Sequence, residues 1–202
     1  MELDLTGFAA LLTALGLGPV LMKMVEYWIS KRNNSKSKES GFSDVFEAIH
    51  KTYYVLMNLL KKSNAKRILL LKTTNGGGRP QLSRKLYVSV MYEVYDDPLG
   101  SVKSDWQEQE LDPQYLDLLF QMNKEGKLVV ETEDLPAGML RNVYESQGIK
   151  QSYIYKIVER EKEYIYISFN FIDRYEADAK MNELFRSGVT KLRLLFQKIN
   201  GI

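Results

Sequence analysis

The stretch KRILLLKTTNGGGRPQLSRKLYVSVMYEVYD, residues Lys66 to Asp96, decides how the rest of the chain folds. Ile68 to Thr73 is a run of apolar and β-branched residues in which Lys72 is the one exception, and Tyr87 to Tyr95 is rich in Tyr and Val. Runs of this kind are typical of strands inside a covered sheet. Between them, Asn75-Gly76 is a hairpin signal, because both residues tolerate the positive φ that tight turns require. The stretch therefore predicts two long paired strands at the centre of a sheet.

Further helices and strands are predicted on both sides of this hairpin. Apolar residues at helical spacing indicate amphipathic helices from Asp44 to Lys62 and from Tyr175 to Asn200. A second hairpin is predicted from Ser152 to Glu159 and from Tyr164 to Phe171, around a charged turn. The chain between the hairpins holds a helix from Asp112 to Lys124, a strand from Leu128 to Thr132 and a short helix from Leu135 to Gln147. This order predicts an α+β domain with an antiparallel sheet of five or six strands.

The composition excludes several classes of active site. There is no cysteine, and His50 is the only histidine. Thiolate metal sites, cysteine nucleophiles and sites that need two imidazoles are therefore excluded. The carboxylates between Asp105 and Asp112 match no metal-binding loop and fit a solvated surface. We predict no catalytic residues, no metal and no cofactor, and the net charge of +2 gives no reason to expect nucleic-acid binding.

The N-terminal segment predicts a membrane anchor. Leu5 to Met22 carries no charge, and Tyr27 and Trp28 follow where interfacial aromatic residues would lie. The basic tract from Lys31 to Lys38 then predicts a single pass through the cytoplasmic membrane, with the N-terminus outside and the following domain in the cytoplasm. Gly16 to Pro19 also fits a break between two helices of a soluble or peripheral hairpin. The expected organisation is a transmembrane helix in residues 1–30, contacting lipid through 5–29, a flexible linker in 31–41 and a folded domain in 42–202.

Three segments of the folded domain resemble the GAF domain, a relative of PAS domains. They are RILLLKTTNGGG, EDLPAGMLRNVYESQGIKQSYIYKI and EYIYISFNF, and the resemblance covers Phe42 to Gly201. It implies a GAF-like sheet with the first and last helices packed on one face and a ligand pocket on the other. It also implies a homodimer formed through the long helices. The cysteine that bilin-binding members use is missing, so the resemblance implies no specific ligand.

The anchor and domain together resemble small phage or bacterial proteins that tether a GAF-like domain to a membrane. The expected function is that of a membrane-anchored cytoplasmic sensory or interaction module, with a pocket for a small molecule. The alternative is a ligand-free structural or regulatory protein, for example in a phage lysis or membrane-takeover complex. A pocket filled by the chain's own Tyr and Leu side chains would favour this alternative.

The predicted ligand site combines the glycine-rich connection with aromatic and acidic side chains. Successive N–H groups of such a turn can bind an anion, and an arginine adds a charged fork. Glu93 would need a cationic partner, such as Arg79 or Lys72, if it were buried. The predicted site residues are Asn75, Gly76, Gly77, Gly78, Arg79, Tyr92, Glu93 and Trp106. The glycines also fit a simple hairpin turn, and the aromatic residues also fit a packed sheet.

Overall fold

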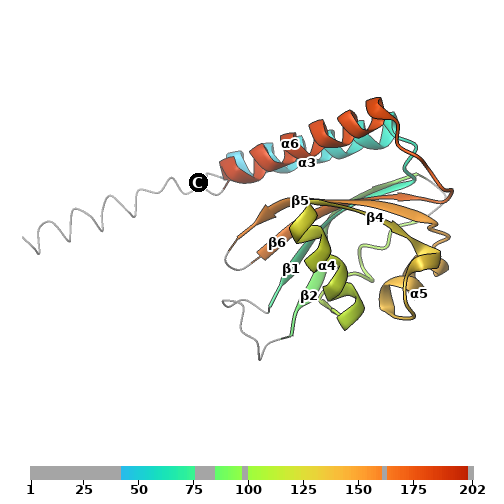
Figure 1. Cartoon of the computed structure of the whole chain (residues 1–202). Helices are drawn as coiled ribbons and strands as arrows, with labels where there is room; N and C mark the ends of the chain where they lie inside the picture. The colour runs from blue at the N-terminus through green and yellow to red at the C-terminus, as the bar shows by residue number, and fades with distance from the viewer. Residues whose placement is uncertain (1–41, 76–84, 97–99, 161–162, 200–202) are drawn as a thin grey trace, which may run out of the picture. The chain divides into compact units, whose positions relative to one another are not determined.

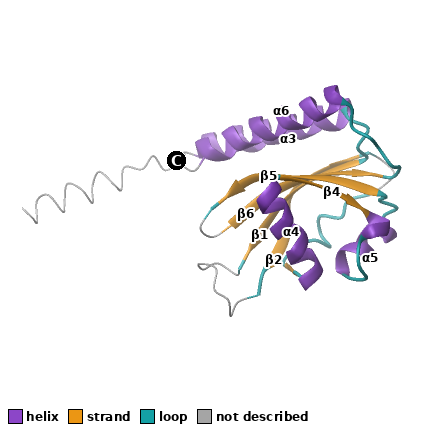
Figure 2. Ribbon diagram, viewed as in Figure 1, coloured by secondary structure: helices purple, strands orange, loops and turns teal. Residues whose placement is uncertain are grey.

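The computed structural model describes residues 42–75, 85–96, 100–160 and 163–199. Within them, six strands form one antiparallel sheet, and helices cover both of its faces (Figure 1, Figure 2). The predicted α+β class is therefore confirmed. The predicted membrane segment and linker lie outside the described residues. In the described part of the chain, no helix combines the length and the apolar character that crossing a membrane requires.

The sheet is built around β1 (Arg67–Thr74), the first strand of the central stretch. Its neighbours are β2 (Tyr87–Tyr95) on one side and β6 (Glu163–Phe171) on the other. The outer strands are β5 (Gln151–Glu159), which pairs with β6, and the two edge strands β3 (Gln109–Glu110) and β4 (Lys127–Glu131). The order across the sheet is β3-β2-β1-β6-β5-β4. β1 is a central strand, as its apolar sequence indicates, and most of its side chains are buried, both those on one face of the sheet and those on the other.

Two long helices, α3 (Phe42–Lys62) and α6 (Ala179–Ile199), lie side by side on one face of the sheet (Figure 1). They approach closely because Gly188 of α6 has no side chain where it faces Leu59 of α3. A Cβ atom at Gly188 would lie 2.7 Å from the Leu59 methyl carbons. The prediction that the first and last helices pack on one face is confirmed.

The opposite face is covered by α4 (Pro113–Glu125), the short 3-10 helix η1 (Thr132–Asp134) and α5 (Met139–Ser146). Asp112 caps the N-terminus of α4, as predicted, since its Oδ1 accepts a hydrogen bond of 2.8 Å from the Tyr115 N–H. Its Oδ2 accepts a second bond of 2.8 Å from the Met139 N–H, at the start of α5. One carboxylate therefore holds the N-terminal ends of both helices together.

Apolar side chains form two cores, one on each face of the sheet. The core beneath α3 and α6 includes Phe169 and Phe185, whose ring centroids are 4.3 Å apart. The core beneath α4 and α5 includes Trp106. Consecutive strand residues point to opposite faces, so Leu70 belongs to the first core and Leu71 to the second. The sheet thus separates two compartments, and a ligand site can be sought in each.

Candidate functional site

The face on which a ligand was expected is filled by the chain's own aromatic side chains. Trp106 is only 4% exposed and packs against Tyr115, with ring centroids 6.2 Å apart. The Tyr115 hydroxyl in turn shares a hydrogen bond of 2.7 Å with the hydroxyl of Tyr166 in β6. Burial raises the pKa of both tyrosines, so the hydroxyls remain protonated in this core. The middle of this compartment is therefore packed.

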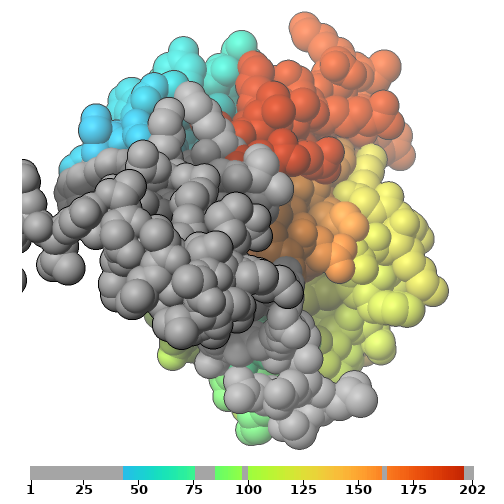
Figure 3. Space-filling model, turned by 90° about the vertical axis from the view of Figure 1, so that its left-hand side faces the viewer, coloured from blue at the N-terminus to red at the C-terminus, as the bar shows by residue number. Residues whose placement is uncertain are grey.

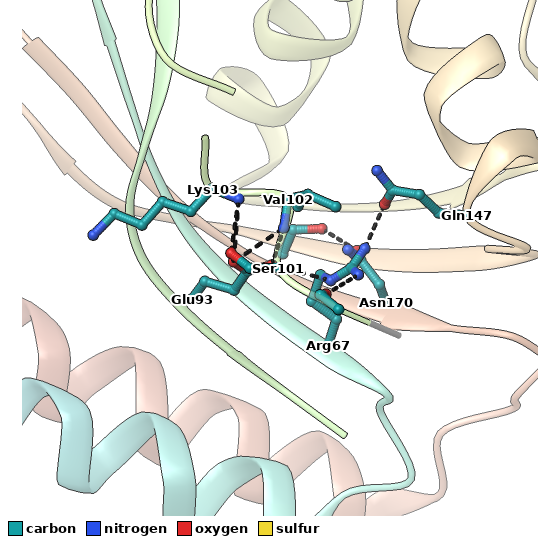
Figure 4. A network of polar contacts seen from close by, with 9 residues as sticks. Arg67, Glu93, Ser101, Val102, Lys103, Gln147 and Asn170 are labelled. Carbon is teal, nitrogen blue, oxygen red and sulfur yellow. Dashed lines mark hydrogen bonds and ion pairs between the residues drawn. The ribbon is translucent and has the colours of Figure 1, made fainter. Parts of the chain in front are cut away.

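At one end of the same compartment lies a buried ion pair between Arg67 and Glu93 (Figure 4). The Arg67 Nε atom is 3.2 Å from Glu93 Oε1, and the two side chains are 1% and 3% exposed. Arg67 also donates to the carbonyl of Gly100, at 2.9 Å, and to the side-chain oxygen of Gln147. Burial lowers the pKa of the Arg67 guanidinium, and the charge of Glu93 acts in the opposite direction. The arginine thus joins the start of β1 to β2, to the following loop and to the end of α5.

The Glu93 carboxylate is held from its other side by the loop that follows β2. It accepts a hydrogen bond of 2.5 Å from the Ser101 hydroxyl and bonds of 3.0 and 3.2 Å from the N–H groups of Val102 and Lys103 (Figure 4). Both ions are thus held by groups of the chain itself. The network therefore has a structural role: it fixes the loop of residues 100–103 against the sheet, and its charges are balanced without a bound anion or cation.

The ionic partner predicted for Glu93 is corrected by this arrangement, because the partner that the described residues supply is Arg67, whereas Lys72 was expected and Arg79 lies outside the described residues. In the register of β1 and β2, Glu93 lies opposite Leu69. Arg67 is two residues away along β1, so it lies on the same face and diagonally across from Glu93. The sequence pattern did not reveal this pairing because it does not fix the register between the strands.

The described residues of the predicted site do not share one pocket. Tyr92 lies on the face covered by α3 and α6, where its ring meets that of Tyr53 edge-on at a centroid distance of 5.2 Å. Trp106 lies in the core of the other face. Asn75 directly follows β1 and lies six residues beyond Leu69, which is opposite Glu93 in the register. At roughly 3.3 Å per residue, Asn75 is therefore about 20 Å from Glu93 along the sheet. Gly76 to Arg79 lie outside the described residues.

Asn75 does line a cavity of about 280 Å³ at the end of the sheet. In Figure 3, which looks onto this end, the β5–β6 hairpin in orange lies between α6 in red and the yellow segment that includes the end of α4. The apolar walls are formed by Leu86, Leu116, Leu119 and Phe120. Tyr164 also lines the cavity, and its buried hydroxyl has no hydrogen-bond partner in the described part of the chain. The predicted site did not include Tyr164, which lies directly opposite Thr73 in the register of β1 and β6.

A larger hollow lies on the outer surface of the two long helices. We call it the helix-layer groove; its volume is about 1010 Å³, and it is lined by Tyr54, Val55, Asn58, Leu59, Lys62, Asp178, Lys180, Met181, Glu183, Leu184, Ser187, Gly188 and Lys191. Tyr54 is 69% exposed at this groove, and Met57 and Leu194 are further exposed apolar residues of the same two helices. An exposed apolar surface with a charged rim is typical of a protein contact.

The fold is similar to that of several GAF domains of known structure. The GAF domain/HD domain protein from Geobacter sulfurreducens superposes with a TM-score of 0.56 at 17% sequence identity, covering 81% of this chain and 98% of that chain. A far-red cyanobacteriochrome photoreceptor gives a TM-score of 0.52 at 11% identity, with 90% and 98% covered. The GAF domain of a two-component sensor histidine kinase from Bacillus halodurans gives 0.51 at 11% identity, with 72% and 92% covered.

No protein-family model matches the sequence, and no curated protein is significantly similar to it. At the identities found among the solved structures, the likeness concerns the fold alone. The chain therefore has a GAF-like fold, as its sequence predicted.

Proposed function

We propose that this chain is a non-enzymatic GAF-like interaction module, anchored in the cytoplasmic membrane through residues 5–29, with its folded domain in the cytoplasm. One observation carries the proposal: the compartment where a ligand was expected is packed, while apolar side chains are exposed on the helix layer. Trp106 and Tyr115 are buried in their core, whereas Tyr54 is exposed and available for contact. The surface of the two long helices is therefore the part of the domain best suited to contact another protein.

The partner proposed for this surface is a second copy of the chain. The rim of the helix-layer groove carries Lys62, Lys180 and Lys191 together with Asp178 and Glu183. A rim with both charges can complement itself when two copies meet, because a basic residue of one copy can face an acidic residue of the other. The resemblance to GAF domains also implies a dimer through the first and last helices.

The test is the oligomeric state of the full-length protein in a neutral detergent, measured by light scattering. We expect a dimer for the wild type and a monomer for Tyr54→Glu, because the substitution places a charge in an apolar contact. The matched control is Phe120→Glu on α4, where an aromatic side chain is 60% exposed on the other layer. A dimer that survives Tyr54→Glu but dissociates with Phe120→Glu would place the interface elsewhere.

A second candidate function is small-molecule sensing at the cavity beside Asn75. The observation that favours it is the buried Tyr164 hydroxyl, which lacks a partner in the described residues and would gain one from a ligand that displaces the side chains around it. The cavity is slightly smaller than the usual ligand site of about 300 to 1,000 Å³, so the ligand would be small. Native mass spectrometry of the protein purified from cells tests this, since a sensor would carry a bound compound.

The ligand-free alternative uses the same helix surface with a different partner. In that case the chain is a structural or regulatory part of a larger membrane assembly, for example a phage lysis or membrane-takeover complex. The same mass measurement separates the two cases, because a mixed assembly would have a mass that no multiple of this chain explains.

A further inference from the structure

β4 is an edge strand of the sheet, and half of its backbone groups face away from β5. Two hydrogen bonds fix the phase of the ladder: the Lys156 N–H donates to the Gly126 carbonyl at 3.1 Å, and the Thr132 N–H donates to the Lys150 carbonyl at 2.9 Å. In an antiparallel pair, such bonded positions alternate along each strand. The residues whose backbone groups turn outward are therefore the odd-numbered ones, Lys127, Val129 and Glu131.

This edge lacks two of the features that often protect a sheet edge from pairing, a proline and a β-bulge. The strand KLVVE contains no proline, and its pairing with β5 runs without a bulge. Lys127, which could guard the edge, turns back across the sheet, since its Nζ lies 5.3 Å from the ring centroid of Tyr153 and 3.2 Å from the side-chain oxygen of Asn182. Val129 is 41% exposed, and its N–H and carbonyl have no partner in the described part of the chain.

An acidic groove of about 370 Å³ runs beside this edge, between β4 and α4. Its apolar surface is supplied by Leu118, Leu128, Val130, Leu135 and Pro136, and its carboxylates are Asp117, Glu131 and Asp134. None of the described lining residues is basic. Asp117 and Asp134 form no ion pair within the described residues, so their charges are available to a partner.

We propose that the β4 edge binds an extended basic segment of a partner protein, which adds to the sheet as a further strand. The outward N–H and carbonyl of Val129 would supply the main-chain hydrogen bonds of such an addition. Side chains alternate along the added strand, so one face would place Lys or Arg against Asp117 and Asp134. The other face would carry β-branched residues that cover Val129. This site lies on a different layer from the helix-layer groove and is independent of dimer formation.

The first experiment measures the binding of a fluorescein-labelled peptide, VKVKVKV, to the full-length protein in a neutral detergent by fluorescence anisotropy. Two further peptides separate the two parts of the proposal. VEVEVEV reverses the charge, and VKPKVKV removes a main-chain donor and the extended pairing while it keeps all three lysines. We expect both to bind at least about tenfold more weakly than VKVKVKV. The groove carboxylates repel the glutamate peptide, and the proline peptide cannot complete the backbone hydrogen bonds of an added strand. Equal binding of VEVEVEV would overturn the proposal.

The second experiment uses substitutions in the protein. Val129→Pro removes an N–H that points outward, so pairing with β5 is kept while strand addition is blocked, and VKVKVKV binding should be lost. Asp134→Asn should weaken binding about two- to fivefold, the range of an exposed ion pair. Its matched control is Glu125→Gln, because Glu125 is exposed, forms no ion pair within the described residues and does not line the groove. If Val129→Pro unfolds the domain, the proposal is tested by Asp134→Asn and by the VKPKVKV peptide.

Two results would contradict the proposal. One is unchanged binding of VKVKVKV to both Val129→Pro and Asp134→Asn. The other is tighter binding of a peptide of residues 31–41, KRNNSKSKESG, than of VKVKVKV, because the occupant would then be the basic tract of a second copy of this chain. Binding that falls with added salt, together with loss in Val129→Pro, supports strand addition by a basic partner.

Discussion

At the scale of single residues, the ion pair of Arg67 and Glu93 has the largest expected effect on stability. Both side chains are almost completely buried, and each holds part of the loop that contains Ser101. Removing one charge leaves the other buried without its partner, which typically costs about 3 to 5 kcal/mol. We therefore expect Glu93→Gln to lower the free energy of unfolding by an amount near the bottom of that range, because the amide keeps some hydrogen bonds.

Urea unfolding of the full-length protein, followed by circular dichroism, measures this effect. Arg67→Met should destabilise at least as much as Glu93→Gln, whereas Glu145→Gln, which breaks an exposed pair with Arg141, should change the free energy by less than about 0.5 kcal/mol. Similar small effects for all three substitutions would show that the buried pair is not needed for the fold.

Tyr155 gives a second prediction at this scale, on the dependence of stability on pH. Burial raises the pKa of Tyr155 to about 12, above the value of about 10 for an unfolded tyrosine. The folded chain therefore keeps this proton while the unfolded chain loses it, so the contribution is complete below about pH 10 and is lost as the pH rises toward 12. In Tyr155→Phe, we expect a smaller loss of stability between pH 9 and pH 11.5 than in the wild type.

The measurement is the urea midpoint at a series of alkaline pH values. Tyr54→Phe is the control, because it removes a tyrosine hydroxyl from an exposed position on α3. A residual alkaline loss is expected in Tyr155→Phe, since burial also raises the pKa of Tyr115, Tyr144 and Tyr166. An identical pH dependence in wild type and Tyr155→Phe would show that Tyr155 titrates alike in both states.

At the scale of elements, the contact between α3 and α6 depends on the missing side chain of Gly188. A leucine there would occupy the space of the Leu59 methyl groups, which lie 2.7 Å from the position of a Cβ atom. Overpacking of this kind typically costs about 1 to 3 kcal/mol. We expect Gly188→Leu to be destabilised by that amount, and the double variant Leu59→Ala, Gly188→Leu to recover part of the loss. Thr190→Leu, exposed on the same helix, is the control in the same thermal unfolding experiment.

The same scale shows which parts of the structure the sequence could predict. Signals that act within a few residues are sufficient for β1, β2 and the start of α4, because alternation, strand composition and the cap at Asp112 are local. The pairing of Arg67 with Glu93 depends on strand register, which no local signal fixes. The burial of Trp106 likewise depends on the loop that carries it, so an aromatic residue suited to stacking on a ligand could not be distinguished from a core residue.

The predicted ligand site shows the same limit. Tyr92 and Glu93 are adjacent in sequence, but strand geometry sends their side chains to opposite faces of the sheet. Asn75 is the described member that lines a cavity, and the other walls of this cavity come from α4 and the β5–β6 hairpin. Such a site is assembled by tertiary structure from segments that carry no shared motif.

At the scale of the whole molecule, the proposed anchor determines where the domain acts. The uncharged segment from Leu5 to Met22 is close to the length of about 20 apolar residues that spans a bilayer, whereas electrostatic attachment through Lys31 to Lys38 alone would be screened by salt. We expect the full-length protein to stay with the membrane fraction after a high-salt wash. A shortened chain that begins at Ser40 should be found in the soluble fraction. Release of the full-length protein by salt alone would instead indicate a peripheral hairpin held by charge.

The orientation of the anchor gives the last prediction. The basic residues Lys31, Arg32, Lys36 and Lys38 follow the apolar segment, whereas Glu2 and Asp4 precede it. By the positive-inside rule, we expect the domain that starts at Phe42 to lie on the cytoplasmic side. A protease added outside intact cells should leave the domain uncut, and the same protease should digest its exposed segments once the cells are opened. Digestion in intact cells would reverse the topology and place both the helix-layer groove and the β4 edge outside the cytoplasm, where they would meet a different set of partners.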